Sequence, residues 1–306
     1  MLAIRMNDSY LGNINVKRDG IQQQWTEEQV VEYAKCMKDP AYFARTYVKI
    51  ISLDKGLVNF DLYPYQEKMF DHFNDNRFSI VLACRQSGKS ISSVVYLLWY
   101  AVFHPEKTIA VLANKGATAR EMLARVTLAL ENLPFFLQPG CRALNKGSIE
   151  FSNNSRIIAA ATSGSSIRGM SVNLLFLDEF AFVERAAEFY TSTYPVISSG
   201  KDTKVIITST ANGIGNTYHK IWEGAVQKVN EYKAFTVNWW DVPGRDEEWK
   251  RQTISNTSQL QFDQEFGNTF FGTGDTLIGA ETLLNLRALP PIKVLENGCL
   301  NVYEET

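Results

Sequence analysis

The chain has 306 residues, of which 45% are apolar and 21% charged, so it is long enough for one large domain or two smaller ones and has a globular composition. Its formal charge of −2 excludes a chain coated in basic residues, although a local patch that binds nucleic acid is still compatible with it. No apolar run approaches the ~20 residues of a membrane span, and residues 1–10 contain no apolar segment typical of a secretory signal.

The cysteines and the charges are unevenly distributed. Four cysteines lie far apart with no CxxC pair, which argues against a zinc knuckle and favours reduced thiols: Cys36, Cys84, Cys141 and Cys299. Residues 237–306 contain 5 Lys and Arg against 11 Asp and Glu, which leaves 26 against 22 for residues 1–236. The last quarter therefore differs electrostatically from the rest.

The elements can be predicted in chain order. Residues 1–24 are polar and predict an irregular N-terminal arm. Thr26 is a typical helix N-cap, and a second helical segment follows over 40–50. Strands and helices then alternate: we expect strands over 78–83, 108–113, 174–177 and 205–208, helices over 89–103, 117–132 and 216–229, and a hairpin of 148–151 with 156–160.

This alternation predicts an α/β fold with a parallel-rich sheet between helices, because the strands are apolar on both faces. The pattern changes after residue 237, where Trp239-Trp240, Pro243-Gly244 and acidic clusters appear. We therefore expect an arm over 1–24, a core domain over 25–236 and a small C-terminal subdomain with the start of a linker over 237–306.

A phosphate-binding loop is predicted between the strand 78–83 and the helix 89–103, at Cys84-Arg85-Gln86-Ser87-Gly88-Lys89-Ser90. Backbone N–H groups at a helix N-terminus would surround the β-phosphate of ATP. Lys89 would reach the β- and γ-phosphates, and Ser90 would hold Mg²⁺. Ala83 stands where such loops usually begin with glycine, and a purely structural loop is the alternative.

Arg85 is a cation inside this loop, where most such loops carry a neutral residue. It could lie beside the γ-phosphate and stabilise the charge that develops during transfer. The alternative is a surface arginine paired with a nearby carboxylate.

Two acids follow the apolar strand 174–177, at Asp178 and Glu179. We expect this strand to neighbour the phosphate-loop strand. Asp178 would then contribute to the Mg²⁺ shell, and Glu179 would orient or deprotonate the attacking water. Adjacent acids at a strand end also occur by chance.

Three further groups are weaker candidates. Thr208-Ser209-Thr210 ends the next strand and could sense the γ-phosphate, or simply cap the next segment. Tyr65 and Gln66 could stack on adenine and bond its edge. Arg168, in a polar loop bracketed by glycines, could reach a nucleotide in this chain or a neighbour, or be a solvated cation.

Taken together, these motifs resemble the large terminase subunit of tailed bacteriophages, of the T-even myophage type. The resemblance rests on five segments: Tyr65-Gln66, Cys84 to Ser90, Ile167-Arg168-Gly169, Leu177 to Phe182 and Thr208 to Gly213. It extends to three more, Phe136 to Gly140, Pro195 to Gly200 and Gly272 to Ile278, and so covers roughly residues 25–279.

The resemblance implies a P-loop ATPase of the additional-strand, RecA-like class that uses Mg-ATP to move double-stranded DNA into a procapsid. It further implies that Arg85 acts in cis on the γ-phosphate, that Glu179 is the catalytic carboxylate and that Arg168 acts in trans within a ring. In the same way, Thr208-Ser209-Thr210 would be the coupling motif and Gln66 the adenine sensor.

The implied partners are double-stranded DNA, a portal protein and a small terminase subunit. The implied location is the host cell cytoplasm during phage assembly. We expect a homo-oligomeric ring when the protein is docked and a monomer when it is isolated. Members of this family normally continue into a ribonuclease-H-like nuclease domain, for which the ~70 residues after 237 leave no room, so we expect no nuclease activity from this chain.

Two other functions share part of this pattern. A DExx-type helicase would have the same loop and acids but needs a second RecA-like lobe. A non-hydrolysing nucleotide-binding scaffold would not require both Lys89 and Glu179.

Overall fold

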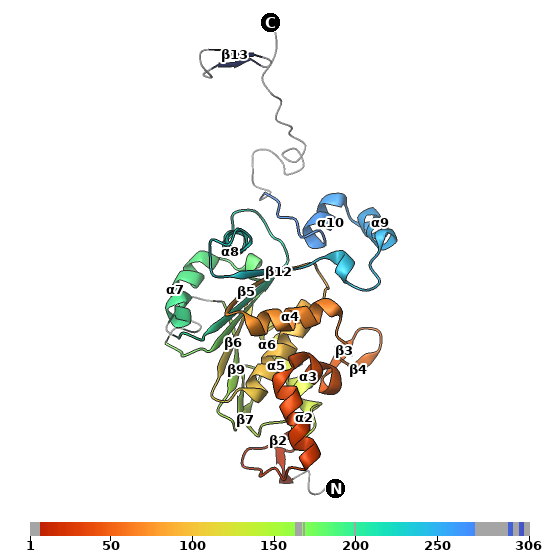
Figure 1. The fold of residues 1–306 in the computed structure, drawn as a ribbon, viewed down its shortest axis with the longest axis vertical. Helices are drawn as coiled ribbons and strands as arrows, with labels where there is room; N and C mark the ends of the chain where they lie inside the picture. The colour runs from red at the N-terminus through yellow and green to blue at the C-terminus, as the bar shows by residue number, and fades with distance from the viewer. Residues whose placement is uncertain are drawn as a thin grey trace. The chain divides into compact units, whose positions relative to one another are not determined.

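The computed structural model describes residues 7–162, 167, 169–198, 200–272, 293–295 and 300–302. Its centre is an eight-stranded sheet (Figure 1), whose strand order is β12 (Lys233–Val237), β5 (Phe78–Ala83), β11 (Lys204–Ser209), β10 (Leu174–Asp178), β6 (Thr108–Ala113), β9 (Arg156–Ala161), β8 (Ser148–Phe151) and β7 (Cys141–Leu144). The first six of these strands run parallel; β8 is antiparallel to β9, and β7 is antiparallel to β8.

Helices cover both faces of the sheet (Figure 1). One face packs against α2 (Glu27–Lys38), α3 (Pro40–Tyr47), α4 (Pro64–Asp75), α5 (Lys89–Phe103) and α6 (Gly116–Glu131), and the other against α7 (Ala186–Ser198) and α8 (Thr217–Val226). Alternate residues of β5 pack into the two hydrophobic cores on opposite faces of the sheet, because successive strand side chains point to opposite faces. Val81 and Ala83 join the first core, and Ile80 and Leu82 the second. The predicted α/β class with a parallel-rich sheet is confirmed.

The N-terminal arm is more ordered than its polar sequence predicts. Its described residues form a hairpin of β1 (Ser9–Tyr10) and β2 (Asn13–Lys17). Val16 is buried, and the ammonium of Lys17 donates to the Phe135 carbonyl at 3.0 Å. The predicted second helix also ends early, at Tyr47, because residues 49–59 form a hairpin of β3 (Lys49–Ser52) and β4 (Gly56–Asn59).

Residues after β12 add an aromatic segment to the core. Short 3₁₀ turns at Phe180–Phe182 and Trp239–Asp241 precede α7 and α9 (Glu247–Asn256), and α10 (Gln259–Glu265) follows. Trp239 and Phe262 belong to the core on the α5 side of the sheet. The compact unit therefore extends through residue 270, and the subdomain bounds predicted from 237 onward stay a prediction. The second unit, 271–306, contains a hairpin of β13 (Lys293–Leu295) and β14 (Leu300–Val302).

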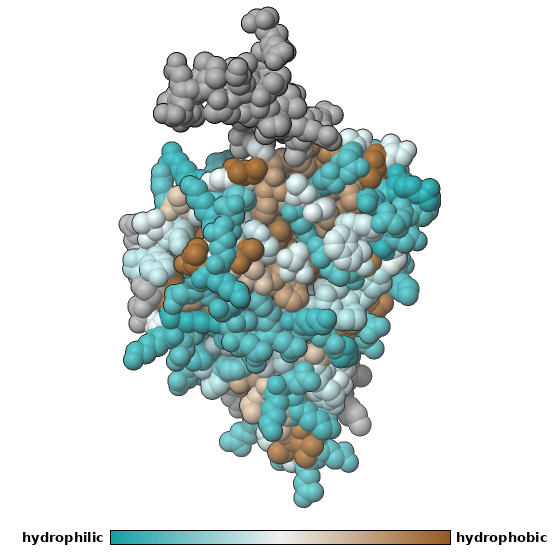
Figure 2. All heavy atoms as spheres, turned by 45° about the horizontal axis from the view of Figure 1, so that its top comes forward, coloured by the Kyte–Doolittle hydropathy of each residue, from teal (hydrophilic) through white to brown (hydrophobic). Residues whose placement is uncertain are grey.

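The face shown in Figure 2 is largely hydrophilic, with hydrophobic residues in scattered groups. Within the described part of the chain, no helix is both long enough and apolar enough to cross a bilayer.

Candidate nucleotide-binding site

The loop between β5 and α5 has the backbone of an anion-binding concavity. Gln86 and Gly88 adopt left-handed conformations, with φ of 56° and 75°, and such turns point successive N–H groups toward one centre. A side chain at this position would also crowd the buried Gln66, because a Cβ would lie 2.7 Å from the Gln66 Nε2. Among the described residues no side chain caps α5, so its N-terminal N–H groups face the same concavity.

One polar atom of this loop lacks a partner. The Ser87 hydroxyl is buried and makes no hydrogen bond to any described residue. A buried hydroxyl without a partner costs free energy, so such groups are usually satisfied by a ligand or water. A phosphate oxygen in the concavity would supply the missing acceptor.

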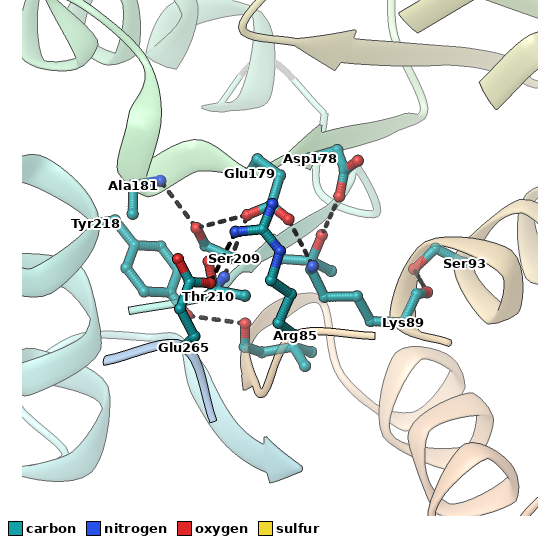
Figure 3. Close-up of polar contacts among 12 residues, drawn as sticks. Arg85, Lys89, Ser93, Asp178, Glu179, Ala181, Ser209, Thr210, Tyr218 and Glu265 are labelled. Carbon is teal, nitrogen blue, oxygen red and sulfur yellow. Dashed lines mark hydrogen bonds and ion pairs between the residues drawn. The ribbon is translucent and has the colours of Figure 1, made fainter. Parts of the chain in front are cut away.

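Lys89 and Glu179 meet at the centre of the site (Figure 3). Lys89 is 7% exposed, and its Nζ donates to the Glu179 Oε1 at 2.6 Å. The other carboxylate oxygen accepts from the Ser209 hydroxyl at 3.3 Å and from the Thr210 N–H at 3.2 Å. The structure thus joins the predicted phosphate lysine to the predicted catalytic acid across 90 residues of sequence.

Asp178 is the last residue of β10 and is almost fully buried. Its Oδ1 accepts from the Thr208 hydroxyl at 2.9 Å. Burial raises the pKa of the Asp178 carboxyl, and the nearby Lys89 charge opposes that shift. A bound cation would act in the same direction as Lys89, because it favours the ionised form.

The strand that carries the two acids is not a direct neighbour of β5, and that prediction is wrong. The central strand β11 lies between β5 and β10, with Ser209 in register with Leu82 and Thr208 in register with Asp178. The insertion has a chemical consequence, because the hydroxyl-bearing end of β11 now lies between the loop and the acids. The Ser209 hydroxyl also accepts from the Ala181 N–H at 3.2 Å (Figure 3).

Arg85 is paired with Glu265, which sequence reasoning did not identify. Its Nη1 donates to the Glu265 Oε2 at 2.9 Å, and its backbone N–H donates to the Glu265 carbonyl at 2.8 Å (Figure 3). Pairing with a carboxylate was one of the two interpretations of this residue. Action on a γ-phosphate stays a prediction, and it requires the guanidinium to leave Glu265.

Tyr65 and Gln66 of α4 pack against the phosphate-binding loop. The Tyr65 hydroxyl donates to the Ser87 carbonyl at 2.5 Å, and the Gln66 Oε1 accepts from the Tyr63 N–H at 2.9 Å. Both side chains are less than 8% exposed. Their predicted contacts with adenine stay a prediction.

A cavity of about 680 Å³ opens beside the loop, within the range typical of small-molecule sites. Its walls combine the loop with apolar residues of the β3–β4 hairpin and the exposed side of α6: Lys49, Ile50, Ile51, Leu53, Gln86, Ser87, Gly88, Lys89, Ser90, Ile91, Glu121, Ala124, Arg125 and Leu128.

Cys84 and Arg168 are the remaining predicted positions. Cys84 is buried at the start of the loop, where Arg245 donates to its Sγ at 3.4 Å. Arg245 had no signal in the sequence, since only the fold brings it to the loop. Arg168 lies outside the described residues.

The residues present fit a magnesium ion bound together with phosphates. Ser90 lines the cavity next to Lys89, and Asp178 offers a buried carboxylate. The described residues contain no cluster of three His, Cys, Asp or Glu side chains. Mg²⁺ in nucleotide sites needs no such cluster, because one or two protein oxygens, phosphates and waters complete its shell.

Comparison with known proteins identifies the family. Residues 80–284, more than half of the chain, match the family described as the terminase large subunit, T4likevirus-type, N-terminal. The chain belongs to this family. It therefore corresponds to the N-terminal part of a terminase large subunit, and the T-even resemblance of the sequence is confirmed.

Solved structures of phage terminases share the fold of this terminase domain. The ATPase domain from Thermus phage P74-26 is 20% identical, with 69% of this chain and 100% of that chain covered and a TM-score of 0.53. The HK97 bacteriophage large terminase is 15% identical, with 76% and 55% covered and a TM-score of 0.63. A large terminase from a thermophilic bacteriophage, solved in complex with ADP, is 12% identical, with 69% and 54% covered and a TM-score of 0.56. This chain thus spans about half the length of the last two terminases.

Proposed function

We propose that this chain is the motor domain of a phage packaging terminase, which hydrolyses ATP to drive double-stranded DNA into a procapsid. One observation supports this above all: the ion pair of Lys89 with Glu179, at the mouth of an anion-binding loop. Terminases of the same fold have been solved with ADP and with ATP-γ-S, which is consistent with nucleotide use by this fold.

In this proposal, each side chain has a role set by its position. The loop N–H groups and the Ser87 hydroxyl bind the phosphates, and Lys89 turns from Glu179 to the β- and γ-oxygens. Glu179 then keeps its bonds to Ser209 and Thr210, which hold the carboxylate where it can orient and deprotonate water.

Ser90 and Asp178 are the proposed magnesium ligands. When bound, Mg²⁺ would neutralise charge on the β- and γ-phosphates. The Thr208 hydroxyl fixes the Asp178 carboxylate, so the residue is held before any ion arrives.

Three further assignments extend the proposal. Arg85 and Arg168 would stabilise transferred charge, Arg85 from within the chain and Arg168 from a neighbouring subunit. The end of β11 would couple hydrolysis to movement, because Ser209 and Thr210 contact the acid that handles the water. Tyr65 and Gln66 would recognise adenine.

The proposed partners follow from the packaging role. They are double-stranded DNA, a portal protein, a small terminase subunit and further copies of this chain in a ring, with a monomer in isolation, all within the host cell cytoplasm. DNA affinity should be independent of sequence and should fall as salt rises, since phosphate contacts dominate such binding. We also propose that the chain has no nuclease activity, which incubation with plasmid DNA and Mg²⁺ would test.

The test of the proposed function is ATP turnover by the purified chain. Lys89→Ala should abolish turnover and weaken binding of ADP, whereas Lys115→Ala, an exposed lysine before α6, should leave both unchanged. Equal turnover in the parent and in Lys89→Ala would contradict the proposal. A non-hydrolysing scaffold predicts nucleotide binding without turnover, and a helicase predicts unwinding of a tailed duplex.

A further inference from the structure

Arg245 contacts the phosphate-binding loop from its outer side. Its Nη1 donates to the Arg85 carbonyl at 3.1 Å and its Nη2 to the Gln86 carbonyl at 3.0 Å. The guanidinium therefore bridges two consecutive peptide groups of the loop. Arginine suits this task because its planar fork presents parallel donors, which a lysine cannot do.

The guanidinium is held in place by aromatic rings of the following segment. Its central carbon lies 4.8 Å from the centre of the Trp249 ring and 5.4 Å from that of Phe266. These two rings contact each other edge to face at 5.1 Å. Such contacts favour a cation over the ring faces and restrict its motion.

The two bonded carbonyls belong to the peptides whose N–H groups are those of Gln86 and Ser87. A carbonyl that accepts a hydrogen bond polarises its peptide, which makes the N–H of the same peptide a stronger donor. In a nest these N–H groups are the ones that bind an anion. Arg245 thus acts on the phosphate side of the loop through two peptide groups.

We propose that Arg245 is a positioning residue for nucleotide phosphates, which shapes and polarises the loop by bridging the carbonyls of Arg85 and Gln86. This inference rests on the proposed function, since it concerns the same loop and the same ligand. It adds that the aromatic segment of α9 and α10 is part of the phosphate site, through a residue that touches no ligand itself.

The test compares Arg245→Lys and Arg245→Gln with a matched control, Arg251→Lys. Arg251 is an exposed residue of α9 that pairs with Glu248, so its replacement leaves the loop untouched. For each protein, the dissociation constants of ADP and adenosine are measured by calorimetry or by competition with a fluorescent ADP. Thermal unfolding without nucleotide monitors folding.

We expect both Arg245 variants to bind ADP about tenfold more weakly, which corresponds to about 1.4 kcal/mol. Adenosine binding should stay within twofold of the parent, because adenosine has no phosphate for the loop. A merely structural role would weaken both ligands together. Lysine should not rescue the loss, because it keeps the charge but not the bridge.

ADP affinity within twofold of the parent in a folded Arg245→Gln or Arg245→Lys would overturn the inference. So would an equal loss for adenosine and ADP. If the parent chain itself bound no ADP, the proposed function would fail and this inference with it. If one Arg245 variant did not fold, the other would give the same comparison.

Discussion

Replacing Glu179 by glutamine separates the two roles of this carboxylate. In the structure it neutralises Lys89 at 2.6 Å, and in the proposed reaction it activates water. The change keeps the shape of the side chain and its ability to accept from Thr210, and it removes the charge. We therefore expect hydrolysis to fall while nucleotide binding improves.

Both magnitudes can be worked out from the contacts. A catalytic acid should contribute at least ~100-fold to turnover, or ~2.7 kcal/mol. Lys89 is 8% and Glu179 32% exposed as side chains, so their bond is a partly buried, charge-assisted one worth about 1.5–3 kcal/mol. In Glu179→Gln the single amide oxygen accepts from Thr210, so the amide NH₂ faces Lys89 and this bond is lost. ATP binding must break the bond in the parent, so Glu179→Gln should bind ADP and ATP about tenfold more tightly, or by about 1.4 kcal/mol.

The assay measures steady-state turnover and the ADP dissociation constant of the same preparation. Glu188→Gln is a suitable control, because Glu188 is an exposed glutamate of α7. Turnover within threefold of the parent would refute the catalytic role. Weaker ADP binding would refute the idea that Lys89 must be released before it can bind phosphate.

Three further perturbations give distinct results. Gly88→Ala should lower the free energy of unfolding by about 1–2 kcal/mol, because φ is 75° and the new Cβ would lie 2.7 Å from the buried Gln66 amide. In the control Gly147→Ala, the nearest atom to the new Cβ would lie 3.5 Å away, so its unfolding free energy should change little. Urea unfolding measures both. Glu265→Gln should shift the melting temperature only slightly, because the Arg85–Glu265 ion pair is solvent-exposed. It should lower the KM for ATP up to about fivefold, because it weakens the pair that holds Arg85 away from the nucleotide. An unchanged KM would mean that this ion pair does not compete with the nucleotide. Burial lowers the pKa of His72 below its usual 6.5, so on acidification the unfolded chain takes up this proton before the folded chain does. The free energy of unfolding should therefore fall as the pH falls through 6.5, by at most ~1.4 kcal/mol per pH unit. An identical pH dependence of the unfolding free energy in His72→Gln would contradict this.

The sequence predicts the elements that a local pattern encodes. The strands over 78–83 and 108–113 and the helix over 89–103 have the bounds expected of them, because their apolar runs end at glycine, proline or polar residues. The meeting of Lys89 and Glu179 also follows, since carboxyl ends of parallel strands share one edge of the sheet.

What the sequence missed depends on contacts between distant segments. The edge strand β12 is mostly exposed and its five residues include Lys233 and Thr236, so it lacks the apolar run that marks the buried strands. The position of β11 between β5 and β10 could not be predicted, because no residue of β11 indicates which strands it pairs with. Arg245 and Glu265 are ordinary surface residues by composition, and they gain a role only because α9 and α10 pack beside the loop.

The position of β5 also constrains how the chain can be assembled during synthesis. This strand hydrogen-bonds to β11 on one side and β12 on the other, and both are made more than 100 residues after it. Until residue 237 has left the ribosome, the strand that supports the phosphate loop has at least one open edge, which is a hazard for aggregation. A truncation before residue 204 should therefore yield no nucleotide binding, however complete the loop sequence itself is.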